Sequence, residues 1–375
     1  MTEWKEYKLG ELTIDGKGSY GIAAPAVDYD SNKYTYLRIT DINDDGTLNK
    51  NGLKSVDDKN AHKYLLQQND IVFARTGASV GRSYFYDERD GELVYAGFLI
   101  KYSIDPTKVN PKILKFYTHS QAYYDWIQTV DNGATRGNIN AQTYASMPII
   151  LPERHEQDRI VSILSSLDDK IDLLHRENAT LEQMAETLFR QWFVVEAKEE
   201  WEEGKLGDLI EVKYGKDHKK LLDGEIPVIG SGGIMRYADT ALYDKESVLI
   251  PRKGTLNNVM YINEPFWTVD TMFYTEMRRP NIAKFVFHFM KCQDLANMNV
   301  GSAVPSMTTE VLNNIPIDIP PQEVFDRFEN AVASLYSKKE QNNKQIQTLM
   351  QTRDGVLPRL MSGGGEIVNT HVQNL

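Results

Sequence analysis

The chain has 375 residues, of which 41% are hydrophobic and 25% charged, and its formal net charge is −11. These values are ordinary for a globular protein of two or three domains, and the sequence has no apolar run of about 18 residues that could cross a membrane. The single cysteine, Cys292, cannot form an internal disulfide, and no signal peptide is expected at the first residues. We therefore expect a cytoplasmic protein that has no membrane partner.

The first part of the chain, residues 1–152, shows short β-strand patterns followed by a helix. Runs of β-branched and aromatic residues bounded by Gly, Asn and Asp predict strands at 34–39, 70–74 and 93–100. A helix is predicted from Pro111 to about Gln128, and a Pro-flanked apolar strand at 147–152 closes this part. We predict that it is a globular domain of mixed α/β structure.

A long helix is predicted within residues 153–198. Its apolar residues recur at alternating steps of four and three, which is typical of a coiled-coil seam rather than of the broad apolar stripe of a surface helix. The polar seam residue Asn178 either sets the register of the pairing or is a frayed position that faces solvent. The predicted seam consists of Ile160, Leu164, Leu167, Ile171, Leu174, Asn178, Leu181, Ala185 and Leu188.

Residues 199–375 repeat this order of elements. Strands are predicted at 226–230, 247–250 and 269–274, a helix from Asn281 to about Ala296, and a closing strand at 315–320, so that 199–320 form the second globular domain. The second long helix is predicted at 321–361, and the Gly-rich residues 362–375 are predicted to be a flexible tail. The seam of the second helix is predicted to consist of Phe328, Val332, Leu335, Asn342, Ile346 and Leu349.

The repeated order reflects a duplication at the scale of a domain. Residues 4–12 (WKEYKLGEL) recur at 201–209 (WEEGKLGDL) at a shift of 197, and residues 147–152 (MPIILP) recur at 315–320 (IPIDIP) at a shift of 168. Two copies related by a local two-fold axis would place their helices antiparallel. We therefore predict an α+β fold in which two globular mixed α/β domains are separated by two long helices that form an antiparallel coiled coil, with an internal pseudo-two-fold repeat.

Three pairs of turns carry residue types that contact nucleic acids, since Arg, Lys, Asn, Ser and Thr bind base edges and cations bind phosphates. For each turn, the alternative is a structural turn or a solvated loop. We expect Arg75 to contact a base, so that Arg75→Ala weakens discrimination at one base pair by about 1–3 kcal/mol, and Lys219 to contact phosphate. The turn after Ala74 and its counterpart in the second copy supply Arg75, Thr76, Ser79, Arg82, Arg252, Lys253, Asn257 and Asn258. The loop 132–140, opposite 299–306, supplies Arg136 and Asn138, and the cluster 214–220, opposite 16–20, supplies Lys216, Lys219 and Lys220.

Several segments resemble type I restriction-modification specificity subunits. The similar segments are 151–160 (LPERHEQDRI), 164–171 (LSSLDDKI), 188–193 (LFRQWF) and the repeated opening at Trp4 and Trp201. The resemblance spans essentially the whole chain, and it departs from the family pattern at 321–325 (PQEVF). It implies that the globular domains are target recognition domains, each of which binds one half of a split, asymmetric site in double-stranded DNA, and that the helices set the distance between them.

The resemblance further implies that the chain is a non-catalytic subunit. Two modification (adenine methyltransferase) subunits and the restriction (motor-nuclease) subunits would be its partners, and these would bind S-adenosylmethionine, ATP and Mg. From the residues themselves we expect no metal or cofactor in this chain, because the seven histidines lack metal-ligand spacing and no Walker lysine motif is present. Two alternatives remain: a coiled-coil scaffold whose globular halves bind proteins and not DNA, and a self-contained nuclease.

Overall fold

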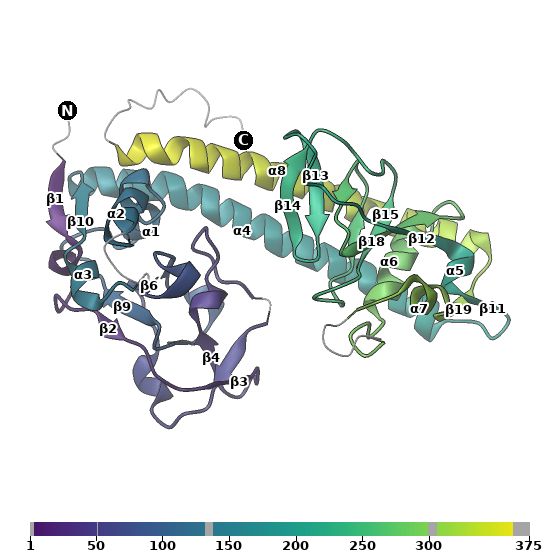
Figure 1. Cartoon of the computed structure of the whole chain (residues 1–375), viewed down its shortest axis with the longest axis horizontal. Helices are drawn as coiled ribbons and strands as arrows, with labels where there is room; N and C mark the ends of the chain where they lie inside the picture. Colours follow the sequence, from purple (N-terminus) through teal and green to yellow (C-terminus); the bar gives the residue numbers. More distant parts are fainter. Residues whose placement is uncertain (1–3, 51, 132–137, 299–305, 363–375) are drawn as a thin grey trace. The chain divides into compact units, whose positions relative to one another are not determined.

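The computed structural model describes residues 4–50, 52–131, 138–298 and 306–362 (Figure 1). The chain divides into two units, one formed by residues 1–173 and 345–375 and the other by residues 174–344. The boundary falls within the two long helices, α4 (Arg154–Arg190) and α8 (Gln322–Met361). Each unit therefore contains one globular half and a part of both helices.

The globular half of unit 1 contains two four-stranded sheets. The first has the strand order β2-β9-β6-β7 and the second the order β3-β5-β4-β8. Strand β6 is buried along its whole length, and its Phe73 packs against the rings of Tyr102, Tyr123 and Tyr144. The strands are β2 (Ser19–Tyr20), β3 (Ala26–Asp28), β4 (Tyr34–Leu37), β5 (Lys54–Val56), β6 (Asp70–Ala74), β7 (Ser83–Phe85), β8 (Leu93–Tyr95) and β9 (Leu99–Ser103). The α-helices are α1 (Ile113–Tyr117), α2 (Gln121–Asp131) and α3 (Ala141–Ala145), and short 3-10 turns lie at Leu9–Leu12, Ile39–Asp41, Ala61–Tyr64, Gly77–Ser79 and Glu88–Asp90.

The globular half of unit 2 contains sheets of strand order β12-β18-β15-β16 and β14-β13-β17. As in unit 1, the central strand β15 is wholly buried. The strands are β12 (Ile210–Tyr214), β13 (Ile226–Gly230), β14 (Gly233–Ala238), β15 (Ser247–Pro251), β16 (Met260–Ile262), β17 (Trp267–Thr268) and β18 (Met272–Met277). The helices are α5 (Leu206–Leu209), α6 (Ala283–Lys291) and α7 (Thr309–Asn313), and α4 ends in a π-helical turn at Gln191–Val195.

The duplication is visible in how each globular half is closed. In unit 1, β1 (Lys5–Lys8) pairs antiparallel with β10 (Pro148–Leu151), with Lys5 opposite Leu151. In unit 2, β11 (Glu202–Lys205) pairs in the same way with β19 (Pro316–Ile319), with Glu202 opposite Ile319. These partners differ by the two shifts, 197 and 168, that the sequence repeat shows. The recurring segments therefore form the same two-stranded frame in both units.

The two long helices pair within each unit. In unit 2, Asn342 donates a hydrogen bond to Asn178 (2.9 Å), Lys339 bonds Glu182, and the rings of Phe189 and Phe328 lie 6.2 Å apart. One residue number rises as the other falls, so these parts of α4 and α8 are antiparallel. In unit 1, Arg353 binds Asp168 (3.2 Å) and the ends of α4 and α8 share one core. All predicted seam residues are buried or half-buried, with Asn178 7% and Asn342 1% exposed.

Several predicted elements have different bounds in the structure; the strand predicted at 269–274, for example, is β18 at Met272–Met277. The single strand predicted at 93–100 is two strands, because β8 pairs with β4 in one sheet and β9 pairs with β6 in the other, and the chain changes sheet between them. The single helix predicted from Pro111 is divided into α1 and α2 at Thr118, whose hydroxyl donates to the Lys115 carbonyl. The helix predicted to run from Asn281 to about Ala296 ends at Lys291.

Candidate nucleic-acid interface

Arg75 and Arg252 occupy equivalent positions in the two units. Each follows the buried central strand, β6 or β15, and each donates its backbone N–H to a crossing turn: Arg75 to the Phe98 carbonyl (3.1 Å) and Arg252 to the Thr271 carbonyl (2.8 Å). Two residues later, Gly77 and Gly254 have φ angles of 71° and 86°. This left-handed backbone favours glycine, which explains why Arg-X-Gly occurs in both copies.

The described end of the second predicted loop pairs with the first turn in both units. Asn138 forms an antiparallel bridge with Thr76, and Ser306 forms the corresponding bridge with Lys253. Beside these bridges, Ile139 donates its N–H to the Arg75 carbonyl, and Met307 donates to the Arg252 carbonyl, both at 2.9 Å. In unit 1 the side chains also meet, since Arg75 Nε lies 3.4 Å from Asn138 Oδ1. The structure thus brings together two of the turns that the sequence singled out.

A tyrosine lies beneath each arginine. The guanidinium carbon of Arg75 is 4.9 Å from the ring centroid of Tyr20, and that of Arg252 is 5.4 Å from the ring centroid of Tyr214. Tyr20 ends β2 and Tyr214 ends β12, the edge strands that flank β9 and β18. The two tyrosines are 43% and 51% exposed. A guanidinium over an aromatic face is a cation–π contact that holds the guanidinium plane in place while its N–H edge stays accessible.

The glycine after each tyrosine is required by a close backbone approach. A Cβ atom on Gly21 would lie 2.2 Å from the Ala96 carbonyl oxygen, and one on Gly215 would lie 2.0 Å from that of Val269. Tyr20-Gly21 therefore corresponds to Tyr214-Gly215, so the expected pairing of residues 16–20 with 214–220 is wrong by several positions. The two tyrosines were not among the predicted contact residues; their signal in the sequence is a Tyr-Gly pair that recurs in the two copies.

The other predicted contact residues fall into two groups. Lys216, Lys219, Lys220 and Lys253 are exposed, and Thr76 is half-buried. Ser79 is only 9% exposed, and three more side chains bind within the fold. Arg82 binds the Ile42 carbonyl (3.1 Å) and Asp44 (2.7 Å), Asn258 donates to the Ser231 carbonyl (2.6 Å), and Asn257 accepts from the Ala296 N–H (3.0 Å). For these four residues the geometry favours the alternative of a structural turn. Arg136 lies outside the described residues.

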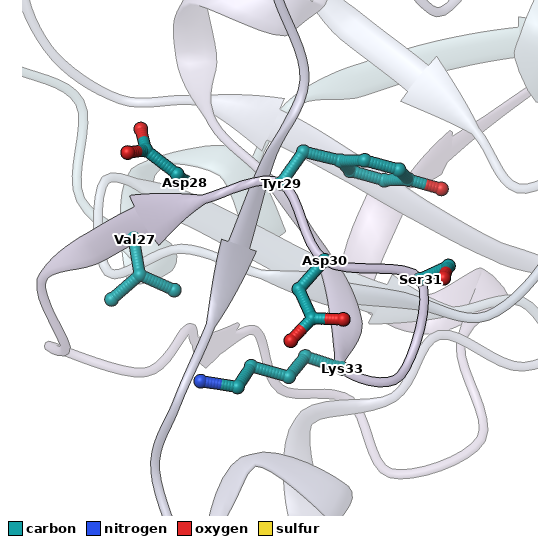
Figure 2. Close-up of a pocket in the computed structure, with 6 residues that line it drawn as sticks. All are labelled: Val27, Asp28, Tyr29, Asp30, Ser31 and Lys33. Atoms are coloured by element: carbon teal, nitrogen blue, oxygen red, sulfur yellow. The ribbon is translucent and has the colours of Figure 1, made fainter.

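A hollow elsewhere in unit 1 contains none of the predicted contact residues. It is lined by residues 27–31 and Lys33, and Figure 2 shows the carboxylate of Asp30 above the side chain of Lys33. The hydrogen bond from Lys54 lowers the pKa of Asp28, and the hydrogen bond from the Asn32 backbone lowers the pKa of Asp30. Two ionised carboxylates repel phosphate, so this hollow is a poor site for a nucleic acid.

The described part of the chain contains neither a candidate metal-binding cluster nor a helix that could span a bilayer. Within residues 4–50, 52–131, 138–298 and 306–362, no cluster of three or more His, Cys, Asp or Glu side chains could hold a metal ion. No helix within these ranges is both long and apolar enough to span a bilayer. The features that recur in both units are an arginine, an aromatic ring and a glycine-containing turn.

The two units present the same basic turn after the corresponding interior strand, β6 or β15, and so contain a duplicated module. Residues 1–183 and 198–348 match the family model described as type I restriction modification DNA specificity domain. The chain therefore belongs to this family, which confirms the resemblance found in the sequence and the duplicated α+β fold.

The relatives are distant in sequence. The MjaIX specificity subunit of Methanocaldococcus jannaschii is 22% identical over 282 residues, which cover 64% of this chain and 65% of that protein, just under two thirds of its length. The HindI specificity subunit of Haemophilus influenzae is 21% identical over an alignment that covers 97% of this chain and all of that protein. The crystal structure of the S subunit from M. genitalium matches with a TM-score of 0.52 at 17% identity and covers 96% of both chains.

Proposed function

We propose that this chain is the sequence-specific DNA recognition subunit of a type I restriction-modification complex. Each globular half contacts one half of a bipartite, asymmetric DNA site, and the chain itself performs no catalysis. The observation that carries this proposal is that Arg75 and Arg252 recur on corresponding turns, each over a corresponding tyrosine. A duplicated phosphate-compatible site suits a ligand that repeats along its length, as DNA does.

The partners and cofactors follow from the family. We infer that modification subunits and restriction subunits dock on this chain and that S-adenosylmethionine, ATP and Mg are bound by those subunits. The relatives are themselves specificity or S subunits. The family membership supports it.

We further propose that the helices set the length of the unrecognised DNA between the two half-sites. Helices α4 and α8 have 37 and 40 residues, so each is about 55–60 Å long. Half-sites on one face of DNA are about 34–36 Å apart, or a multiple of this. Inserting one heptad into both helices keeps the seam in phase, adds about 10 Å and should lengthen the spacer by about three base pairs.

The test is methylation mapping in cells that carry this chain with its modification subunits. We expect one bipartite motif, methylated only when the chain is present, and cells with the modification subunits alone serve as the control. DNA binding by the purified complex should also weaken steeply as salt rises. A complex with neither a sequence motif nor salt-dependent DNA binding would instead favour the alternative of a protein-binding scaffold.

A further inference from the structure

The two units share one set of contacts at the turn that carries the arginine, and they differ around it. The shared features are the arginine, the glycine two residues later, the Tyr-Gly pair and the bridge to the neighbouring loop. The sequence places these features far apart and at different spacings in the two copies, yet the fold assembles them identically. An arrangement that both units share is suited to bind a chemical group that both halves of a DNA site share.

The phosphate backbone is what any two half-sites have in common, whereas their bases differ. Both guanidinium groups are held in place and, among the described residues, are not neutralised by a carboxylate, which suits them to bind a phosphate. The guanidinium carbon of each lies over its tyrosine ring, and neither guanidinium forms an ion pair with a carboxylate in the part of the chain that the structure describes. The nearest bonds are weak or neutral: Arg75 Nε to Asn138 Oδ1 at 3.4 Å, and Arg252 Nη1 to the Asp270 carbonyl at 3.1 Å.

The neighbours of the arginines are the features that differ. The turn that accepts the arginine N–H carries Phe98 in unit 1 and Thr271 in unit 2. Phe98 is 59% exposed, although it lies in an apolar run of sequence. The bridge partners also differ, Thr76 with Asn138 in one unit and Lys253 with Ser306 in the other. Apolar contacts with thymine methyl groups and hydrogen bonds to base edges are the means by which proteins distinguish base pairs.

From this contrast we propose that Arg75 with Tyr20, and Arg252 with Tyr214, are phosphate anchors that act independently of DNA sequence, and that Phe98 is a specificity determinant of the first half-site. This proposal rests on the proposed function and deepens it. It replaces the base contact that the sequence suggested for Arg75. Tyr20 and Tyr214 are positioning residues that hold the guanidinium plane, and the N–H edge of each arginine binds a phosphate oxygen in the manner of charge-assisted hydrogen bonds.

The test compares four variants of the full complex with its modification subunits. Arg75→Ala and Arg252→Ala should each weaken binding to target and non-target DNA by the same factor. Each should also reduce the slope of log affinity against log salt by about 0.9, so that the loss of affinity from 50 to 200 mM salt becomes about 3.5-fold smaller. Methylation mapping should return the wild-type motif for both. Arg75→Lys keeps the charge and should keep the slope, with weaker binding because the stacked plane is lost.

Phe98→Ala is the contrasting variant. It should relax or change the methylated motif in the first half-site only and leave the salt slope unchanged. A motif that is relaxed at a base pair by Arg75→Ala, or an unchanged slope in both arginine-to-alanine variants, would overturn the anchor assignment. Should Arg75→Ala unfold in a thermal melt, Arg75→Lys and Arg252→Ala test the same assignment. If the wild-type complex itself has no motif and no salt dependence, the proposed function fails rather than the anchors.

Discussion

Lys284 is a buried cation that joins the globular half of unit 2 to helix α8. Its side chain, from α6, is 7% exposed, and its ammonium group pairs with Glu246 at 3.0 Å and with Glu329 of α8. It also lies over the rings of Tyr261 and Tyr336, at 5.4 and 5.3 Å from their centroids. We predict that Lys284→Met strongly destabilises this unit.

The expected loss of stability follows from the two carboxylates that Lys284→Met leaves without a cation. Breaking a buried pair by removing one partner costs about 3–5 kcal/mol, and the lower end applies because the Glu246 side chain is 31% exposed. The equivalent lysine of unit 1, Lys115, provides a matched control. It is 29% exposed, and its partner Asp168 keeps a second cation, Arg353. Lys115→Met should therefore cost at most about 1 kcal/mol.

The assay is urea unfolding followed by hydrogen exchange and mass spectrometry, which reports on the two units separately. With a slope of about 2 kcal/mol per molar urea, the midpoint of unit 2 should fall by about 1.5 M in Lys284→Met, while that of unit 1 should fall by at most about 0.5 M in Lys115→Met. Combining Lys284→Met with Glu246→Gln and Glu329→Gln should restore most of the loss, since no buried charge is then left unpaired. Equal losses in the two single variants, or no recovery in the triple variant, would refute this reasoning.

Three further predictions concern stability. Asn342→Leu should cost about 1–3 kcal/mol because it removes the hydrogen-bond donor to the side-chain oxygen of buried Asn178, whereas replacing both with Leu should stabilise the chain and loosen its register, as thermal melts and cross-linking would reveal. Burial lowers the pKa of His288 to about 4. Between about pH 6.5 and pH 4 only the unfolded chain binds a proton at this histidine, so the free energy of unfolding falls as the pH drops through this range. The melting temperature of His288→Phe should depend less on pH in this range, and an equal dependence would contradict the prediction. Gly215→Ala should cost about 3 kcal/mol because its Cβ atom would collide with the Val269 carbonyl oxygen. Gly232→Ala is the control, since Gly232 has open space around it, and it should leave the melting temperature nearly unchanged.

Periodic features of the sequence were sufficient to predict the frame of the fold. The heptad pattern indicated the two long helices, and the repeated segments indicated the strands that close each half, because a seam and a repeat are both local patterns. The change of sheet at Gly97 was not predictable, since residues 93–100 form one apolar run and the sequence does not say which strand each part will pair with. The tertiary pairing of β8 with β4 and of β9 with β6 decides the break.

The candidate site was only partly predictable, for a different reason. Asn and Ser bind turns within the fold with the same groups that bind bases, so the sequence could not separate Asn258, which binds the Ser231 carbonyl, from a DNA contact. The contact of Arg75 with Tyr20 joins the residue after β6 to the end of β2, and neither segment of sequence indicates that the two residues meet. Phe98 resembled a core residue because it lies between apolar neighbours, and only the turn exposes it.

The net charge of −11 does not describe the surface that a phosphate would meet. Acidic residues of α4 pair with cations within their own units: Asp168 with Lys115 and Arg353, and Glu182 with Lys291 and Lys339. Burial opposes the ionisation of Glu182, but the charges of Lys339 and Lys291 and their hydrogen bonds lower its pKa to about 2. These carboxylates are therefore neutralised where they hold the globular halves to the helices. The electrostatic field at Arg75 and Arg252 depends on nearby charges, because exposed charges more than about 10 Å apart are largely screened at 0.1 M salt. A chain that is acidic in total can therefore still present two sites for DNA.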